Sequence, residues 1–161
     1  MRISLGGIAK GYAVDKAIEA LKEKGIKHAL VDAGGDIKTI NGKSDHNPWK
    51  IGVRNPFQKE NLLTVVRLRD GAVATSGNYN IPHILSPRGG VPRELVRVTV
   101  IAGNAVDADA LATTILVSGF KGLELVEKIN GVEVLAVTSD GKMVRSSGFH
   151  LYESKTFPCK L

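Results

Sequence analysis

The chain has 161 residues, of which 43% are apolar and 24% are charged, and its formal net charge is +6. This balance excludes wholesale disorder, and the single Cys159 excludes an internal disulfide framework and a thiolate metal cluster. No apolar run approaches the ~18 residues that would span a bilayer, and the length fits one domain of about 100–200 residues.

Apolar residues at helical spacing predict a first helix over residues 8–24, which Gly25 ends. Alternating and β-branched segments predict strands at 28–31, 49–53, 62–68, 72–75, 95–102, 132–137 and 142–145. Two further helices are predicted at 107–117 and 121–129. Residues Asp32 to Asp36 are interpreted as a glycine-rich turn.

Tight turns join most of these strands, and Asp70-Gly71 predicts a hairpin between the strands at 62–68 and 72–75. Strands joined in this way pair antiparallel, so the predicted class is α+β, with a mainly antiparallel sheet and packed helices. Residues 1–151 are predicted to form a single domain, and residues 152–161 a loosely held tail.

The segment from Leu5 to Tyr12 opens the first helix with glycines and carries Lys10 in its first turn. Free N–H groups at a helix start favour an anion, and the lysine adds a positive charge. The spacing of a Walker A loop is absent, and no strand precedes the segment as a dinucleotide fingerprint requires. A glycine turn into an amphipathic helix with a solvated lysine is the alternative.

Asp109 and Thr113 are four residues apart, so on a helix their oxygen atoms point from one face. A carboxylate and a hydroxyl suit Mg²⁺, which takes its remaining oxygen ligands from phosphate and water. The alternative is structural: an aspartate caps the helix, a role that suits Asp107, and Thr113 bonds to its own helix backbone.

Two further segments are ambiguous when taken alone. A loop carries His83, Arg88 and several hydroxyl groups, and a single loop histidine is commonly incidental. The two glycines before Asp36 would let the backbone approach a ligand, or would simply form a turn.

In this order the segments resemble the ApbE family, the FAD:protein FMN transferases. The resemblance rests on six motifs, at residues 5–12, 34–36, 49–56, 74–79, 83–90 and 108–113. It implies an antiparallel α+β domain similar to the tunnelling-type fold. It also implies Mg²⁺-dependent transfer of FMN from FAD to a Ser or Thr hydroxyl of a target flavoprotein, with release of AMP, or hydrolysis of FAD to FMN and AMP.

The resemblance also implies roles for individual residues. Asp109, Thr113 and the backbone carbonyl of Ala9 match the metal ligands, and Lys10 matches a residue near the diphosphate. His83 matches the proposed base that activates the target hydroxyl, so the predicted catalytic residues are His83, Asp109 and Thr113. The predicted nucleotide-binding residues are Gly7, Lys10, Gly35, Asp36, Ser76, Gly77, His83 and Arg88.

Two other functions stay open. One is a shortened, non-catalytic module that binds flavin nucleotide or serves as a structural partner. It stays open because ApbE proteins are usually longer, with an N-terminal half ahead of this first motif. A basic module that binds nucleic acid is the other, but the positive charges are scattered, so no nucleic-acid partner is predicted. A homo-oligomer is expected to cover surface that the longer proteins bury. Residues 1–7 contain no signal peptide and no lipobox is present, which would place the chain as given in the cytoplasm. Family members are often exported and membrane-anchored, so the compartment is left open.

Overall fold

The computed structural model describes residues 4–58, 60–78, 84–87 and 89–154. Three α-helices lie in this part of the chain, α1 (Ala9–Glu23), α2 (Ala105–Ser118) and α3 (Phe120–Val126), with a short 3-10 helix η1 (Phe149–Leu151). The strands are β1 (Ala29–Ala33), β2 (Asp36–Ile40), β3 (Trp49–Arg54), β4 (Leu62–Leu68), β5 (Gly71–Gly77), β6 (Leu95–Ala102), β7 (Glu133–Thr138) and β8 (Met143–Arg145). No helix in the described residues has the length and apolar character needed to cross a membrane.

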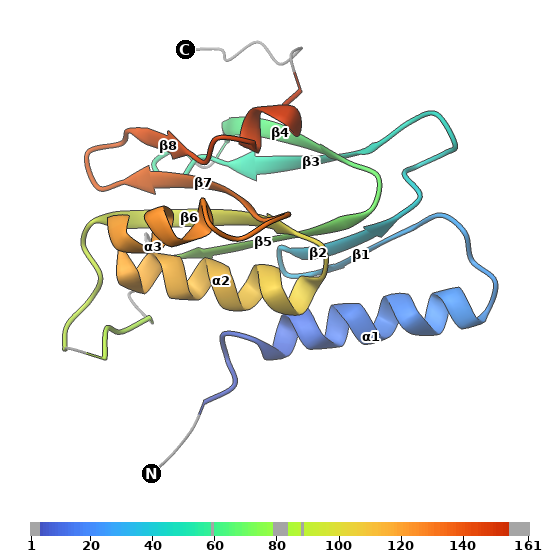
Figure 1. Ribbon diagram of the computed structural model, residues 1–161, viewed down its shortest axis with the longest axis horizontal. Coiled ribbons are helices and arrows are strands. Elements are labelled where there is room, and N and C mark those ends of the chain that lie inside the picture. The colour runs from blue at the N-terminus through green and yellow to red at the C-terminus, as the bar shows by residue number, and fades with distance from the viewer. Residues whose placement is uncertain (1–3, 59, 79–83, 88, 155–161) are drawn as a thin grey trace.

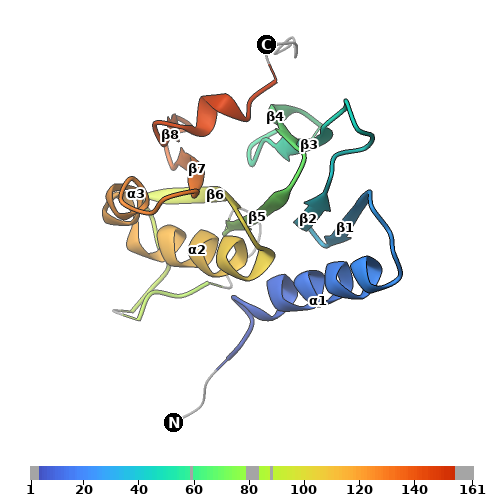
Figure 2. The same ribbon diagram turned by 45° about the vertical axis from the view of Figure 1, so that its right-hand side comes forward.

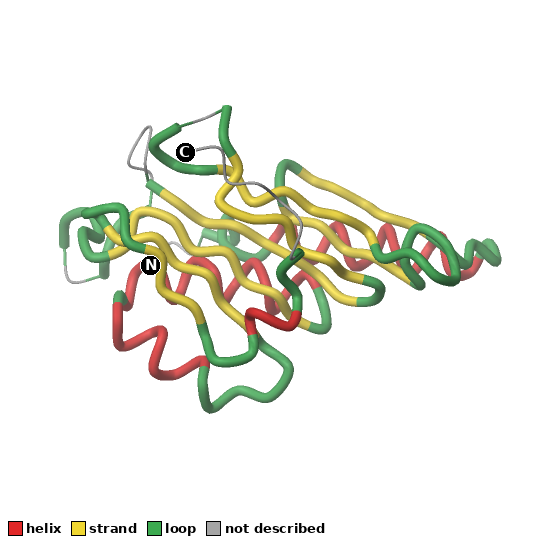
Figure 3. The backbone as a smooth tube through the Cα atoms, turned by 90° about the horizontal axis from the view of Figure 1, so that it is seen from above, coloured by secondary structure: helices red, strands yellow, loops and turns green. Residues whose placement is uncertain are grey.

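Six strands form one sheet in the order β1-β2-β5-β6-β7-β8, and every neighbouring pair is antiparallel. Helices α1 and α2 lie on one side of this sheet, and the separate β3–β4 pair lies on the other (Figure 1). Seen from above, the strands form a layer in front of the two long helices (Figure 3). The predicted antiparallel α+β class is confirmed.

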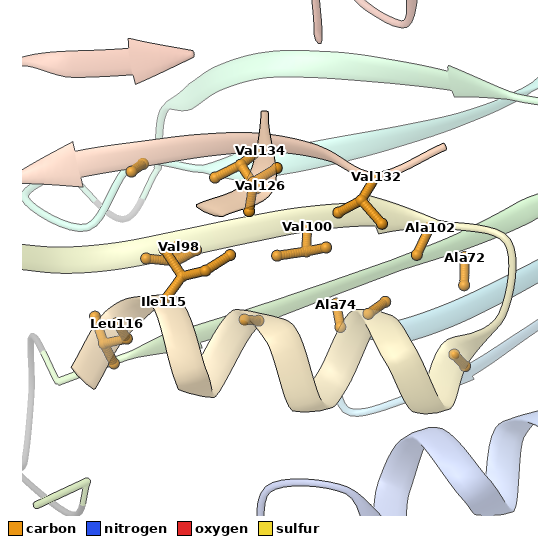
Figure 4. Packing of buried hydrophobic residues seen from close by; sticks show 14 of the residues in the cluster. Ala72, Ala74, Val98, Val100, Ala102, Ile115, Leu116, Val126, Val132 and Val134 are labelled. Carbon is orange, nitrogen blue, oxygen red and sulfur yellow. The ribbon is translucent and has the colours of Figure 1, made fainter. Parts of the chain in front are cut away.

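The larger core cluster lies between α2 and the central strands of the sheet (Figure 4). Small side chains at Ala105, Ala108 and Ala112 recur at helical spacing and are fully buried. Because these alanines are short, α2 lies close against the valines of β6, Val98 and Val100. This packing fixes the distance between α2, which carries Asp109, and the sheet.

The predicted hairpin at Asp70-Gly71 is wrong. Strand β4 pairs with β3, whereas β5 pairs with β2 and β6 in the six-stranded sheet. The chain passes at Gly71 from one layer to the other, because Leu68 packs into the second core cluster, on the far side of the sheet from α2. A turn signal between two apolar segments cannot distinguish a hairpin from such a crossing.

The other edge of β4 is occupied by residues from the end of the described chain. The Arg67 N–H donates to the Tyr152 carbonyl at 2.7 Å, and the Ser154 N–H donates to the Val65 carbonyl at 2.9 Å. Residues 152–154 are therefore held by backbone hydrogen bonds, which corrects the prediction of a loose tail for these three residues; the other tail residues lie outside the described range.

Strand β2 differs from the prediction, in which residues 32–36 form a turn and Asp36 ends it. Only Gly34 and Gly35 form that turn, both at positive φ, and Ala33 pairs with Asp36 across it. Two consecutive residues at positive φ are typical of a tight two-residue hairpin, which glycine adopts without steric cost. The hairpin turns the Asp36 side chain into the protein, where it is 1% exposed.

Candidate functional site

Helices α1 and α2 meet in an antiparallel crossing at their first turns (Figure 2). The crossing is close because Gly11 has no side chain: a Cβ atom there would lie 2.2 Å from the Ala105 carbonyl oxygen. At the start of α1, a Cβ on Gly7 would lie 3.3 Å from the Thr113 methyl group. Two glycines of the first motif therefore bring the start of α1 directly against the helix that carries Asp109 and Thr113.

Two buried aspartates lie at this crossing. Asp109, 3% exposed, accepts a hydrogen bond from the Gly11 N–H at 3.0 Å through Oδ2. Asp36, at the start of β2, pairs with the ammonium group of Lys10 on α1 at 2.6 Å. None of the described lysines, arginines or histidines forms an ion pair with Asp109. The cluster of three side chains, drawn from α1, β2 and α2, thus carries a net negative charge when both carboxylates are ionised.

The pKa of Asp36 is raised above its ordinary value of 3.8, chiefly because burial penalises the charged carboxylate. The ion pair with Lys10 lowers the pKa, whereas the neighbouring Asp109 carboxylate raises it. A raised pKa in the folded state means that Asp36 contributes stability below pH 3.8 and loses that contribution as the pH rises through the raised pKa.

This sign gives a testable result for Asp36→Asn in metal-free buffer. The neutral amide cannot titrate, so we expect the variant to gain stability relative to the wild type as the pH rises from about 4 to 7. Chemical unfolding at several pH values measures the difference, and Asp32→Asn, at an exposed aspartate of the same hairpin, is the matched control. Parallel stability curves for wild type and Asp36→Asn would contradict the assignment.

Two hydroxyl groups adjoin the carboxylates. The Ser76 Oγ on β5 and the Thr113 Oγ1 on α2 are 2.9 Å apart and hydrogen-bonded. The hydroxyl of Thr113 therefore has a partner on a neighbouring strand. The structural alternative, in which Thr113 bonds only to its own helix backbone, does not include this partner. Gly77 follows Ser76 at the end of β5, where it pairs with Arg97 of β6.

The donor atoms at the crossing fit a hard divalent cation. They are the carboxylate oxygens of Asp36 and Asp109 and the hydroxyl oxygens of Ser76 and Thr113. The predicted ligand Ala9 is the first residue of α1, two residues before Gly11. Within the described residues, no three His, Cys, Asp or Glu side chains gather into a group that could hold a metal by themselves. Mg²⁺ suits such a sparse set, because it usually keeps one or two carboxylate ligands and completes its shell with water and substrate phosphate.

The structure brings together six of the predicted site residues: Gly7, Lys10, Asp36, Ser76, Asp109 and Thr113. Gly35 lies at the exposed hairpin turn, and its N–H donates to Asp32. His83 and Arg88 lie outside the described residues. The pairing of Lys10 with Asp36 and the contact of Gly11 with Asp109 were not predicted, since each joins residues far apart in the sequence.

The model of the ApbE family matches residues 1–136 of this chain. The chain belongs to the ApbE family. Among curated ApbE relatives, the FAD:protein FMN transferase of Treponema pallidum is 34% identical over 171 aligned positions, and that of Escherichia coli K12 is 31% identical over 151. The alignments cover 92% and 86% of this chain but only 47% and 43% of the relatives, so the chain spans about half their length.

Solved structures of ApbE proteins share the fold. The crystal structure of the ApbE protein of Thermotoga maritima matches with a TM-score of 0.84 and 38% identity. The match covers 96% of this chain and 54% of the Thermotoga maritima chain. The flavin transferase ApbE of Vibrio cholerae has a TM-score of 0.83 and 31% identity, with 93% and 52% covered. The antiparallel sheet and the crossing of α1 and α2 therefore belong to a domain that this family uses in flavin transferases.

Proposed function

We propose that this chain contributes the metal- and diphosphate-binding part of a Mg²⁺-dependent FAD:protein FMN transferase. One observation carries the proposal: two buried carboxylates, a lysine and a pair of hydroxyls from four separate elements converge where α1 crosses α2. The names of the ApbE relatives support FAD as the substrate and a flavoprotein as the target.

In the proposed reaction, the hydroxyl oxygen of a target Ser or Thr attacks the phosphorus on the FMN side of the FAD diphosphate. A new P–O bond to the target forms while the bond from that phosphorus to the bridging oxygen breaks. AMP leaves with the bridging oxygen, and the hydroxyl proton passes to a base. With water as the acceptor, the products are FMN and AMP.

The residues of this chain serve mainly to position and neutralise, which is what phosphoryl transfer requires of a protein. Asp109, Thr113 and the Ala9 carbonyl would hold Mg²⁺, and the ion when bound would neutralise charge on the diphosphate. Lys10 remains 48% exposed while its ammonium group is held by Asp36, so it keeps donors for a phosphate oxygen. In this role Asp36 orients the Lys10 side chain and is not itself a metal ligand.

The base stays a prediction from the sequence. His83 is the proposed acceptor of the hydroxyl proton, because an imidazole titrates near neutral pH. Arg88 is likewise proposed for the nucleotide. A second copy of the chain as a partner also stays a prediction.

The direct test is to incubate the purified chain with FAD and Mg²⁺, with and without a Ser- or Thr-bearing acceptor protein, and to quantify AMP and FMN by chromatography. AMP release that EDTA stops supports the proposal. If neither AMP nor FMN forms, the chain by itself is not a transferase. FAD that binds but stays intact for hours would instead favour a shortened, non-catalytic ApbE module, an alternative motivated by the half-length match to its relatives.

A further inference from the structure

A second polar cluster joins the same three elements, one to two turns along α1 from the candidate site. The Asp15 carboxylate on α1 accepts hydrogen bonds from the backbone N–H groups of Ala105 and Val106, at 3.0 and 2.9 Å. These are the first two residues of α2. An aspartate of one helix therefore binds the start of the other in bidentate fashion.

Lys38 on β2 completes this cluster. Its ammonium group lies 3.8 Å from Asp15 Oδ1 and donates a hydrogen bond to the Gly103 carbonyl, just before α2 begins. The side chains of Lys38 and Asp15 are only 12% and 16% exposed. Burial lowers the pKa of Lys38, while the Asp15 carboxylate raises it.

The first three residues of α2, Ala105 to Asp107, have N–H groups without partners inside the helix. The Asn104 side chain accepts from the Asp107 N–H, which is an ordinary local cap. The other two of these three N–H groups bind Asp15. The local cap can hold α2 as a helix, whereas the bonds to Asp15 tie the first turn of α2 to α1, one turn from the Gly11–Asp109 hydrogen bond.

The two clusters are in register with each other. Lys38 lies two residues after Asp36 on β2, so both face the helices. Along the antiparallel helices, Asp15 lies beyond Gly11 on α1, and Ala105 lies one turn before Asp109 on α2. A shift of α2 along α1 that breaks the bonds at Asp15 would also move Asp109 away from the Gly11 N–H.

We infer that Asp15 is a positioning residue of this site: it fixes the register of α2 along α1, and so keeps Asp109 and Thr113 opposite the start of α1. The inference deepens the proposed function and rests on it for its catalytic meaning. Asp15 itself touches neither of those two side chains, and Lys38 holds the Asp15 carboxylate in place from the sheet.

The test compares Asp15→Asn with Asn104→Ala in the whole chain. Asp15→Asn keeps the shape but leaves one acceptor for two N–H groups, and removes the charge that Lys38 binds. Asn104→Ala weakens the same helix end through its local cap, without touching α1. It is therefore the matched control for a role in stability alone.

The first readout is hydrogen exchange of the Gly11 amide, followed by NMR. Gly11 lies in the first turn of α1, where N–H groups lack helical partners, and its partner is Asp109. We expect Asp15→Asn to speed its exchange by about tenfold, as the loss of a charge-assisted hydrogen bond would, and Asn104→Ala to leave it unchanged. Equal acceleration in both variants, or none in Asp15→Asn, would overturn the inference.

The second readout is the affinity for Mn²⁺, used as a paramagnetic probe of the cation site. We expect Asp15→Asn to weaken Mn²⁺ binding by about 10–100-fold, the usual effect of losing an outer contact that orients metal ligands, and Asn104→Ala to leave it unchanged. An unchanged affinity in Asp15→Asn, with wild type binding normally, would contradict the positioning role. If Gly11 exchange responds as expected but wild-type protein binds no Mn²⁺, the helix register stands and the proposed function fails.

Discussion

Asp109→Asn is expected to lower AMP release from FAD by at least about 100-fold while leaving the unfolding temperature of the metal-free protein unchanged or higher. The amide oxygen can still accept from the Gly11 N–H, so the helix crossing persists. The amide removes a negative charge beside Asp36, and with it a repulsion that metal-free protein cannot relieve. Loss of activity with retained stability is the mark of a ligand rather than a core residue.

The matched control is Asp107→Asn, the same change two residues earlier on the same helix at an exposed position. Its activity should equal that of the wild type. AMP release and thermal unfolding, measured in parallel for both variants, separate the two roles. If Asp109→Asn releases AMP as fast as Asp107→Asn does, the cation site has been assigned to the wrong residues.

Gly11→Ala is expected to destabilise the protein by about 3 kcal/mol, the upper part of the range for overpacking. In an isolated helix the same change would stabilise by up to ~1 kcal/mol, because alanine has the better helix propensity. Here the new Cβ would meet the carbonyl oxygen and carbon of Ala105 at 2.2 and 2.7 Å, and the Cα of Val106 at 2.9 Å. These are backbone atoms, so the contact is relieved only by separating α1 from α2.

Gly103→Ala is the control, since a Cβ at that exposed residue just before α2 would meet no atom within 4 Å. Urea unfolding of both variants measures the difference in free energy. Gly11→Ala should also lose affinity for Mn²⁺, because the crossing holds the start of α1 against Asp109. A Gly11→Ala variant as stable as Gly103→Ala would show that the two helices do not meet as described.

Periodicity was sufficient to predict the three helices and most strands, because each is a local pattern that one face of the core requires. The sequence also carries a local signal for β2: β-branched Ile37, Thr39 and Ile40 follow directly after a two-glycine turn. Local patterns cannot predict the neighbours of β4, because one of its edges pairs with β3 and the other binds residues 152–154, which lie far along the chain.

The same limit applies to the candidate site. Asp109 and Thr113 were recognised because four-residue spacing puts them on one helix face. The partner of each comes from elsewhere: Gly11 is 98 residues away from Asp109, and Ser76 is 37 residues away from Thr113. Such pairs follow from the packing of α1 on α2, and neither composition nor spacing encodes them. The role of Asp15 at the start of α2 could not be predicted for the same reason.

The central claim is that a divalent cation and a diphosphate meet where α1 crosses α2. Anomalous diffraction from crystals grown with Mn²⁺ and ADP, an adenine nucleotide that carries a diphosphate, tests it most directly. We predict one manganese peak within bonding distance of Asp109, Thr113 and the Ala9 carbonyl, with a phosphate oxygen on the ion and the Lys10 ammonium beside it. A manganese peak at another place in the fold, or none at the crossing in protein that binds the nucleotide, would contradict the claim.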